Sequence, residues 1–197
     1  MIAIVDYKAG NLTSVKLAFE AIGASAVVTS DPAAIAAADR VVFPGVGAAQ
    51  SAMDNLRSLG LVDTVKDAAA SGKPFIGICL GMQILFEHSE EDGGVDTLGV
   101  LKGKVRRFPS VPGFKVPQIG WNTVQFKDAA LAANPAGEFY FVHSYYAEIV
   151  PETVGFADYA GIEFTAMVRR GRLWACQFHP EKSGRVGLAL LRDWLAV

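Results

Sequence analysis

The sequence predicts an α/β protein built on a mostly parallel, twisted sheet with helices on both faces. In its first half, short β-branched runs alternate with alanine-rich stretches that favour helix, which is the pattern of βαβ units. Such crossovers are overwhelmingly right-handed and set successive strands parallel. The second half is rich in strand-like segments with few helices between them. We therefore expect a three-layer first half that leads into a strand-rich second half.

Composition narrows the class of protein further. The chain has 197 residues, a formal charge of −2 and 51% hydrophobic residues, so it can bury a core, and disorder is excluded. We expect one domain over residues 1–197, with no affinity for nucleic acid because a basic field is lacking. The opening MIAIVDYKAGN lacks the pattern of a signal peptide, and no apolar run reaches the ~18 residues of a membrane span. A cytoplasmic protein without membrane contact is the expectation.

The first-half elements follow from periodicity and punctuation. A helix should start at Leu12 and stop at Gly23, and another should cover Asp31–Ala38, where Asp31 can cap and Pro32 suits the first turn. Strands are predicted at residues 2–6, 25–29, 40–43 and 75–78. Ligands of such sheets bind at the carboxyl ends of the strands.

The second-half strands are predicted from runs of β-branched and aromatic residues. They cover residues 100–108, 121–126, 139–149, 154–159, 164–168 and 173–178. A final amphipathic helix from Ser183 to Leu195 places its apolar residues on one side.

A cysteine follows the fourth predicted strand at a tight turn. Cys79 lies in GICLGMQ (residues 77–83), which leads into a helical apolar pattern at Ile84, Leu85 and Phe86. A nucleophile between small residues at a strand-to-helix turn is an elbow, and the helix N-terminus would stabilise the reactive thiolate. The alternative is a buried, inert cysteine at the end of a strand.

A histidine and a glutamate follow the last predicted strand. In QFHPEKS (residues 177–183), His179 can act as a base, and Glu181 lies two residues on. In an extended segment both side chains would project to the same side, so the carboxylate could orient the imidazole. A surface His-Pro turn is the other interpretation.

A glycine-containing loop follows the third predicted strand. In PGVGAA (residues 44–49), backbone N–H groups could face an oxyanion together with the N–H of Leu80. A dinucleotide-binding fingerprint is the rival, but Gln50 stands where glycine or alanine is required, and the loop does not follow the first strand. No phosphate-binding loop of an NTPase is present.

Four other features carry weaker predictions. We expect His88 to be a solvated histidine near the end of the helix after Cys79, and His143 either to line a pocket or to fill the core. Cys176 should be inert packing, and the two cysteines suggest neither a disulfide framework nor a zinc site. The basic residues 102–107 should form an exposed face of a strand pair.

Taken together, the three loops resemble those of class I glutamine amidotransferases, and the resemblance runs the length of the chain. GICLGMQ is similar to their nucleophile elbow, QFHPEKS to their His-Glu segment and PGVGA to their oxyanion loop. Within the family, DYKAGNL, PGVGA, GWN and HSYY most resemble glutaminase subunits of imidazole glycerol phosphate synthase, an enzyme of histidine biosynthesis. The resemblance implies a flavodoxin-like three-layer fold.

The resemblance also implies roles for particular residues. Cys79, His179 and Glu181 would be nucleophile, base and orienting partner, and the backbone at Gly47 and Leu80 would form the oxyanion hole. Glutamine would be held by Gln83, Glu91, Ser144 and Tyr145, and the partner would be met by Asn11, Trp121, Tyr140 and Lys182.

The implied reaction is glutamine hydrolysis without metal or organic cofactor. Ammonia would pass to a cyclase subunit in a heterodimer, and glutaminase activity would be weak without that subunit. Three alternatives stay open: the glutaminase subunit of another synthase, a cysteine hydrolase with the same elbow, and a catalytically silent binding subunit.

Overall fold

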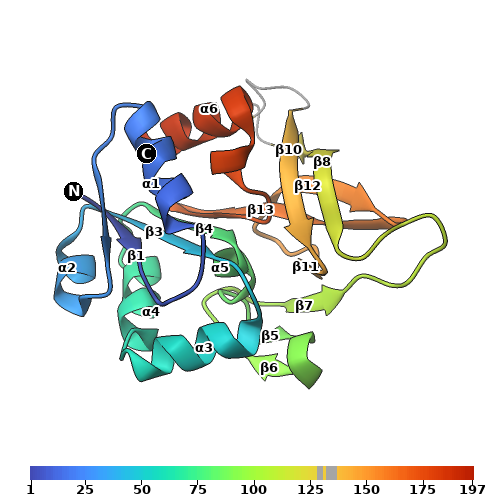
Figure 1. The fold of residues 1–197 in the computed structure, drawn as a ribbon, viewed down its shortest axis with the longest axis horizontal. Helices are drawn as coiled ribbons and strands as arrows, with labels where there is room; N and C mark the ends of the chain where they lie inside the picture. Colours follow the sequence, from blue (N-terminus) through green and yellow to red (C-terminus); the bar gives the residue numbers. More distant parts are fainter. Residues whose placement is uncertain (128–130, 132–136) are drawn as a thin grey trace.

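The sheet that was predicted from the sequence forms the centre of the molecule in the computed structural model, which describes residues 1–127, 131 and 137–197 (Figure 1). A twelve-stranded sheet has the order β2-β1-β3-β4-β14-β13-β11-β7-β5-β6, with β12 and β9 attached through β13. Strands β2, β1, β3, β4 and β14 are parallel neighbours. Beyond β14 the pairing is antiparallel as far as β7. The α/β prediction, with its strand-rich second half, is thus confirmed.

The helices cover both faces of the parallel part. They are α1 (Leu12–Ala21), α2 (Pro32–Ala37), α3 (Ala49–Ser58), α4 (Val62–Ala70), α5 (Leu80–Gln83) and α6 (Gly184–Leu195), with short 3-10 turns η1 (Glu91–Gly93) and η2 (Pro180–Lys182). Buried residues of α1 and α6 pack in one core cluster, while those of α2, α3 and α4 pack in the other. The sheet therefore lies between two apolar layers, and Figure 1 shows α1 and α6 on one side of it and α3 and α4 on the other. Asp31 caps α2 as predicted, accepting from the N–H of Ala33 at 3.0 Å. No helix among the described residues is long and apolar enough to cross a membrane.

The strands are between two and nine residues long. They are β1 (Ile2–Val5), β2 (Ala26–Thr29), β3 (Arg40–Gly45), β4 (Phe75–Cys79), β5 (His88–Ser89), β6 (Val95–Asp96), β7 (Lys104–Arg107), β8 (Gln118–Thr123), β9 (Gln125–Phe126), β10 (Glu138–His143), β11 (Tyr145–Ala147), β12 (Thr153–Tyr159), β13 (Ile162–Arg170) and β14 (Leu173–Cys176). In β1, β3, β4 and β14 nearly every residue is buried, as expected for parallel strands with both faces covered.

A separate two-stranded sheet, β8 with β10, lies beside the main sheet. Phe139, Phe141 and His143 of β10 are buried, whereas Trp121 and Ile119 of β8 are exposed. Because side chains alternate along a strand, the small sheet has one face towards the core and one exposed apolar face.

The helix predicted after Cys79 is much shorter than the apolar pattern suggested. It ends at Gln83, and the N–H groups of Leu85 and Phe86 bond three residues back, to Met82 and Gln83. The carbonyls of Ile84, Leu85 and Phe86 then accept from the following segment, Leu98, Gly99 and Leu101. The apolar run is a buried turn, because its backbone acceptors are taken by another segment. The prediction of a helix-end position for His88 is therefore wrong, since His88 lies in β5 and its Nδ1 contacts Asp96 Oδ1 at 2.9 Å.

Two predicted strands are each divided in the structure. The 139–149 segment is broken at Ser144, because β10 pairs in the small sheet whereas β11 pairs with β7 and β13 in the main sheet. The 121–126 segment is likewise divided between β8 and β9. The break at Ser144 matters most, since it places Ser144 and Tyr145 at the pocket described below.

Candidate active site

The carboxyl ends of β3, β4 and β14 meet above one cavity of about 370 Å³. Gly45 of β3 pairs with Cys79 at the end of β4, and β14 lies on the other side of β4. The loop after β3 contributes Val46 and Gly47 to the cavity wall, and the segment after β14 contributes His179. The three sequence motifs thus converge, as expected at the carboxyl edge of a parallel sheet.

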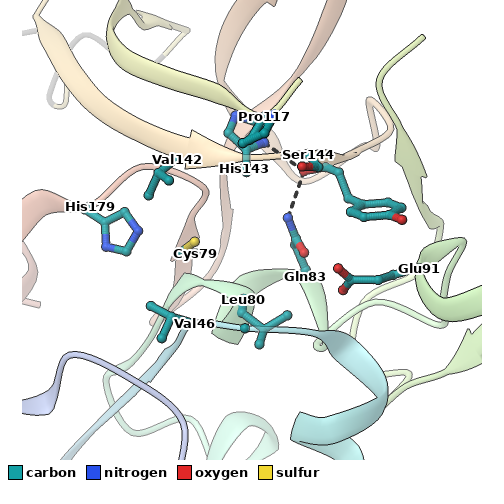
Figure 2. A pocket seen from close by; sticks show the side chains of 12 residues that line it. Val46, Cys79, Leu80, Gln83, Glu91, Pro117, Val142, His143, Ser144 and His179 are labelled. Atoms are coloured by element: carbon teal, nitrogen blue, oxygen red, sulfur yellow. Dashed lines mark hydrogen bonds between the residues drawn. The ribbon is translucent and has the colours of Figure 1, made fainter. Parts of the chain in front are cut away.

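Cys79 occupies a strained backbone conformation between β4 and α5. Its φ is 56° and its ψ is −114°, a region that is costly for a residue with a side chain. The surroundings impose it, because α5 approaches β3 so closely that a Cβ on Gly81 would lie 1.9 Å from the carbonyl oxygen of Phe43. The sharp turn directs the thiol into the cavity, where Figure 2 shows it. The elbow prediction is confirmed in its geometry.

His179 and Glu181 form a buried pair. His179 Nδ1 lies 2.7 Å from Glu181 Oε1, and the two side chains are only 2% and 1% exposed. The expectation of an extended segment is wrong: Pro180 starts the η2 turn, and this turn brings the carboxylate to the ring. The N–H of His179 bonds to the carbonyl of Tyr140 at 2.9 Å, which holds the segment in place.

The electrostatics favour the protonated form of the His179 imidazole. Burial alone lowers the pKa of His179, but its interactions with Cys79 and Glu181 outweigh burial and raise the pKa to about 10. Glu181 fixes Nδ1 as a donor, so Nε2 is left as the nitrogen that exchanges a proton. Nε2 is buried without a hydrogen-bond partner among the described residues, and Figure 2 shows the ring facing the same cavity as the Cys79 sulfur.

The residues expected at an oxyanion hole, Gly47 and Leu80, lie on the wall of the same cavity as Cys79. Leu80 is the first residue of α5, and the first N–H groups of a helix lack intrahelical partners. Gly47 has a φ of 99°, and both residues line the cavity.

All four residues expected to hold substrate line the cavity as well: Gln83, Glu91, Ser144 and Tyr145. Glu91 Oε2 accepts from the N–H of Ala49, the first residue of α3, at 2.7 Å. Burial raises the pKa of Glu91, partly offset by that hydrogen bond. Gln83 Nε2 donates to the carbonyl of Tyr145 at 2.8 Å, and Figure 2 shows its oxygen turned towards Glu91.

Three of the four expected partner contacts form one cluster. Trp121, 55% exposed, stacks edge-on against Tyr140 with ring centroids 6.1 Å apart, and Lys182 Nζ lies 5.8 Å above the Tyr140 ring. Asn11 immediately precedes α1, which packs against the η2 turn that carries Lys182.

Sequence reasoning missed Gln177, whose Nε2 donates to Cys79 Sγ at 3.7 Å. Its place two residues before His179 was the available signal, because residues 177 and 179 both follow directly after β14. His143, left open between pocket and core, does both: it is 5% exposed and lines the cavity. Cys176 is fully buried, as predicted. The basic segment lies on β7, where Arg106 pairs with Glu90 and Glu148.

Solved structures share this fold at low sequence identity. One titled as the crystal structure of a glutamine amidotransferase has a TM-score of 0.77 at 20% identity, covering 100% of this chain and 98% of the other. The structure of PurLQS from Thermotoga maritima has a TM-score of 0.73 at 18% identity, covering 99% of this chain and 97% of that one.

Curated relatives are much more similar in sequence. Proteins named imidazole glycerol phosphate synthase subunit HisH are 50% identical in Synechococcus elongatus, 51% in Rhodopirellula baltica and 48% in Methanothermobacter thermautotrophicus. The alignments cover 98%, 98% and 100% of this chain and 92%, 95% and 98% of those proteins. The model of the family described as glutamine amidotransferase class-I matches residues 3–196. With its elbow cysteine and its buried His-Glu pair at one cavity, the chain belongs to the class I glutamine amidotransferases.

Proposed function

We propose that the protein is the glutaminase subunit of an imidazole glycerol phosphate synthase and acts in histidine biosynthesis. It hydrolyses glutamine to glutamate and ammonia in one amidotransferase domain that spans residues 1–197. The observation that carries the proposal is the strained Cys79 beside the buried His179–Glu181 pair at a single cavity. Relatives of that name at about half identity over nearly the whole chain support it.

In the proposed mechanism Cys79 is the nucleophile. The thiolate attacks the side-chain amide carbon of glutamine, and the carbonyl oxygen becomes an oxyanion that accepts from the N–H groups at Gly47 and Leu80. His179 Nε2 gives its proton to the leaving nitrogen as the C–N bond breaks, which releases ammonia and leaves a thioester. His179 then takes a proton from water, the resulting hydroxide attacks the thioester, and glutamate leaves as the thiolate returns.

The substrate's amino acid group would bind at the opposite end of the cavity from His179. Both N–H groups of Gln83 are already used within the protein, so its side-chain oxygen is the atom left to accept from the substrate ammonium. Glu91 supplies a carboxylate on the same side. A bound ammonium would favour the ionised form of Glu91 and reverse the effect of burial on its pKa. Ser144 and Tyr145 would complete the contact from the break between β10 and β11.

The partner would be a cyclase subunit that docks over the exposed face of the β8–β10 sheet. Ile119 is 64% and Trp121 55% exposed on that face, and Val142 of β10 lines the cavity. Aromatic residues of this kind are typical anchors of protein interfaces. Asn11, Tyr140 and Lys182 would extend the contact. Docking here would place the partner next to the site of ammonia release and keep ammonia from bulk water.

Glutamate release tests the proposal. We expect a low rate for the chain alone, a sharp rise when a cyclase subunit and its nucleotide substrate are added, and no release from Cys79→Ala. If the chain alone releases glutamate rapidly and the cyclase does not change the rate, the protein would be assigned to another pathway. A Cys79→Ala variant as active as the parent would overturn the triad.

A further inference from the structure

A chain of hydrogen bonds between buried groups leads away from the proposed nucleophile. Gln177 Nε2 donates to Cys79 Sγ at 3.7 Å, and Gln177 Oε1 accepts from Gln83 Nε2 at 2.8 Å. Gln83 Nε2 also donates to the backbone carbonyl of Tyr145 at 2.8 Å. Gln177 is fully buried and Gln83 is 5% exposed, so water does not compete for these contacts.

One backbone carbonyl settles which way both amide groups point. The oxygen of Tyr145 can only accept, so the nitrogen of Gln83 must face it. The second N–H of that nitrogen then points to Gln177 and requires the oxygen of Gln177 on that side. The nitrogen of Gln177 is left facing the sulfur. The donor at Sγ therefore follows from the network itself.

The same carbonyl is held from its other side by the small sheet. His143 Nδ1 lies 2.7 Å from Tyr145 O, and His143 Nε2 lies 3.0 Å from the Gln118 amide of the paired strand β8. Burial lowers the pKa of His143 to about 4, so the ring is neutral. Tyr145 O can only accept, so Nδ1 carries the proton, and Nε2 is then an acceptor that requires the nitrogen of the Gln118 amide to face it. Tyr145 O is thus anchored by β10 as well as by Gln83.

A buried glutamine at this place needs a reason, because a buried amide is costly unless both of its ends are paired. An N–H donor gains most when its acceptor is charged, and the thiolate is the charged form of Sγ. His179 cannot hold the sulfur throughout, since it gives up and regains its proton in each cycle. A donor that keeps its protons is suited to that task.

We propose that Gln177 is a positioning residue that donates to the thiolate of Cys79 and holds the sulfur towards the cavity, with Gln83 fixing the Gln177 amide. The proposal rests on the role of Cys79 as nucleophile. It adds to the triad a fourth side chain, one that transfers no proton.

Two substitutions separate this role from packing. Gln177→Leu removes both polar ends at similar volume. Gln177→Glu keeps an oxygen for Gln83 and replaces only the N–H donor with a carboxylate oxygen. Gln125→Leu, an exposed glutamine of β9, is the matched control. The readouts are the rate of alkylation of Cys79 by iodoacetamide between about pH 6 and pH 9, located by mass spectrometry of the full chain, and kcat and KM for glutamine with the cyclase present.

Gln177→Leu should slow alkylation at neutral pH roughly tenfold or more, as expected for the loss of a hydrogen bond to a charged group. Gln177→Glu should slow it further and move the acidic limb of the pH profile to higher pH, and should lower kcat with little change in KM. Gln125→Leu should match the parent. Circular dichroism and Tm establish that each variant is folded, and if Gln177→Leu is not, Gln177→Glu decides.

Alkylation of folded Gln177→Glu at the parent rate across the pH range would overturn the proposal. A parent protein whose Cys79 is not alkylated, or an active Cys79→Ala variant, would instead overturn the assignment of the nucleophile, so the two failures are distinct.

Discussion

The residues proposed for catalysis owe their arrangement to the local geometry of the backbone. Cys79 holds a positive φ, and η2 places a carboxylate against the His179 ring. Each feature costs free energy on its own, strain in one case and desolvation of charge in the other. The surrounding β3, β4 and β14 strands supply the packing that maintains them.

Substitution of the orienting carboxylate tests the His179–Glu181 pair. Glu181→Gln removes the negative charge that holds Nδ1–H and helps to raise the pKa of His179. We expect glutamate release with the cyclase present to fall roughly a hundredfold or more, with folding retained. Glu163→Gln, an exposed glutamate in β13, should leave the rate unchanged. Equal rates for the two variants would remove Glu181 from the mechanism.

His143 should make the stability of the protein depend on pH in the acidic range. Its pKa is about 4 in the folded chain against an ordinary 6.5, so between these values the unfolded chain binds the extra proton. The part of the free energy of unfolding that depends on neutral His143 is therefore fully present above pH 6.5. It is lost as the pH falls towards 4, and the loss is on the order of 3 kcal/mol. His143→Asn, which retains a donor near Nδ1, should lose less stability than the parent over this range.

Urea denaturation of both proteins at several pH values measures the difference. The carboxyl groups common to both proteins cancel when their free energies of unfolding are compared. The same dependence of this free energy on pH in the parent and in His143→Asn would therefore contradict the prediction.

At the scale of the helices and strands, close packing between backbones determines where an element ends as much as helix propensity does. The α5 helix contacts both β3 and β4, and this packing requires that no side chain stand at Gly81. The apolar residues after α5 then turn away from helix, because residues 98–101 bond to their carbonyls. Backbone hydrogen bonds between residues 84–86 and 98–101 thus prevent the helix that the apolar pattern predicts.

Adding one methyl group to α5 should disrupt this contact. Gly81→Ala places its Cβ 1.9 Å from Phe43 O, so β3 and α5 must separate, and we expect a loss of several kcal/mol, on the order of 3. Gly23→Ala is the control, because its Cβ meets open space and only the φ of 81° is unfavourable, at about 1 kcal/mol. Thermal unfolding followed by circular dichroism compares them, and a Gly81→Ala protein as stable as Gly23→Ala would refute the close packing.

At the scale of the whole molecule, the β8–β10 sheet contributes both to the wall of the cavity and to the exposed apolar face. Val142 lines the cavity from β10, and its register partner Ile119 is exposed on β8. A partner on this face would therefore lie next to the proposed chemistry. On β7, Arg106 forms ion pairs with Glu90 and Glu148.

Trp121 should be an anchor for the proposed cyclase. We expect Trp121→Ala to weaken binding roughly ten- to a hundredfold, as truncation of an aromatic hot spot does, and saturating cyclase to recover most of the stimulated glutaminase rate. Calorimetric titration measures the affinity. Val27→Ala, on the edge strand β2 at the far end of the sheet, is the control, and equal affinities for both variants would place the interface elsewhere.

The sequence by itself determined the fold class, the order of the strands along the chain and three motifs at strand ends, because these depend on local periodicity and on glycine and proline positions. The resemblance of these motifs to those of class I glutamine amidotransferases then implied that Cys79 and His179 act together. The tertiary structure decided the rest: the break at Ser144, the turn that pairs Glu181 with His179, and the amide of Gln177 at the sulfur. These features depend on contacts between residues far apart in the chain, 98 positions for Gln177 and Cys79. The local sequence pattern does not predict such contacts, because only the packing of the sheets and their connecting segments brings those atoms together.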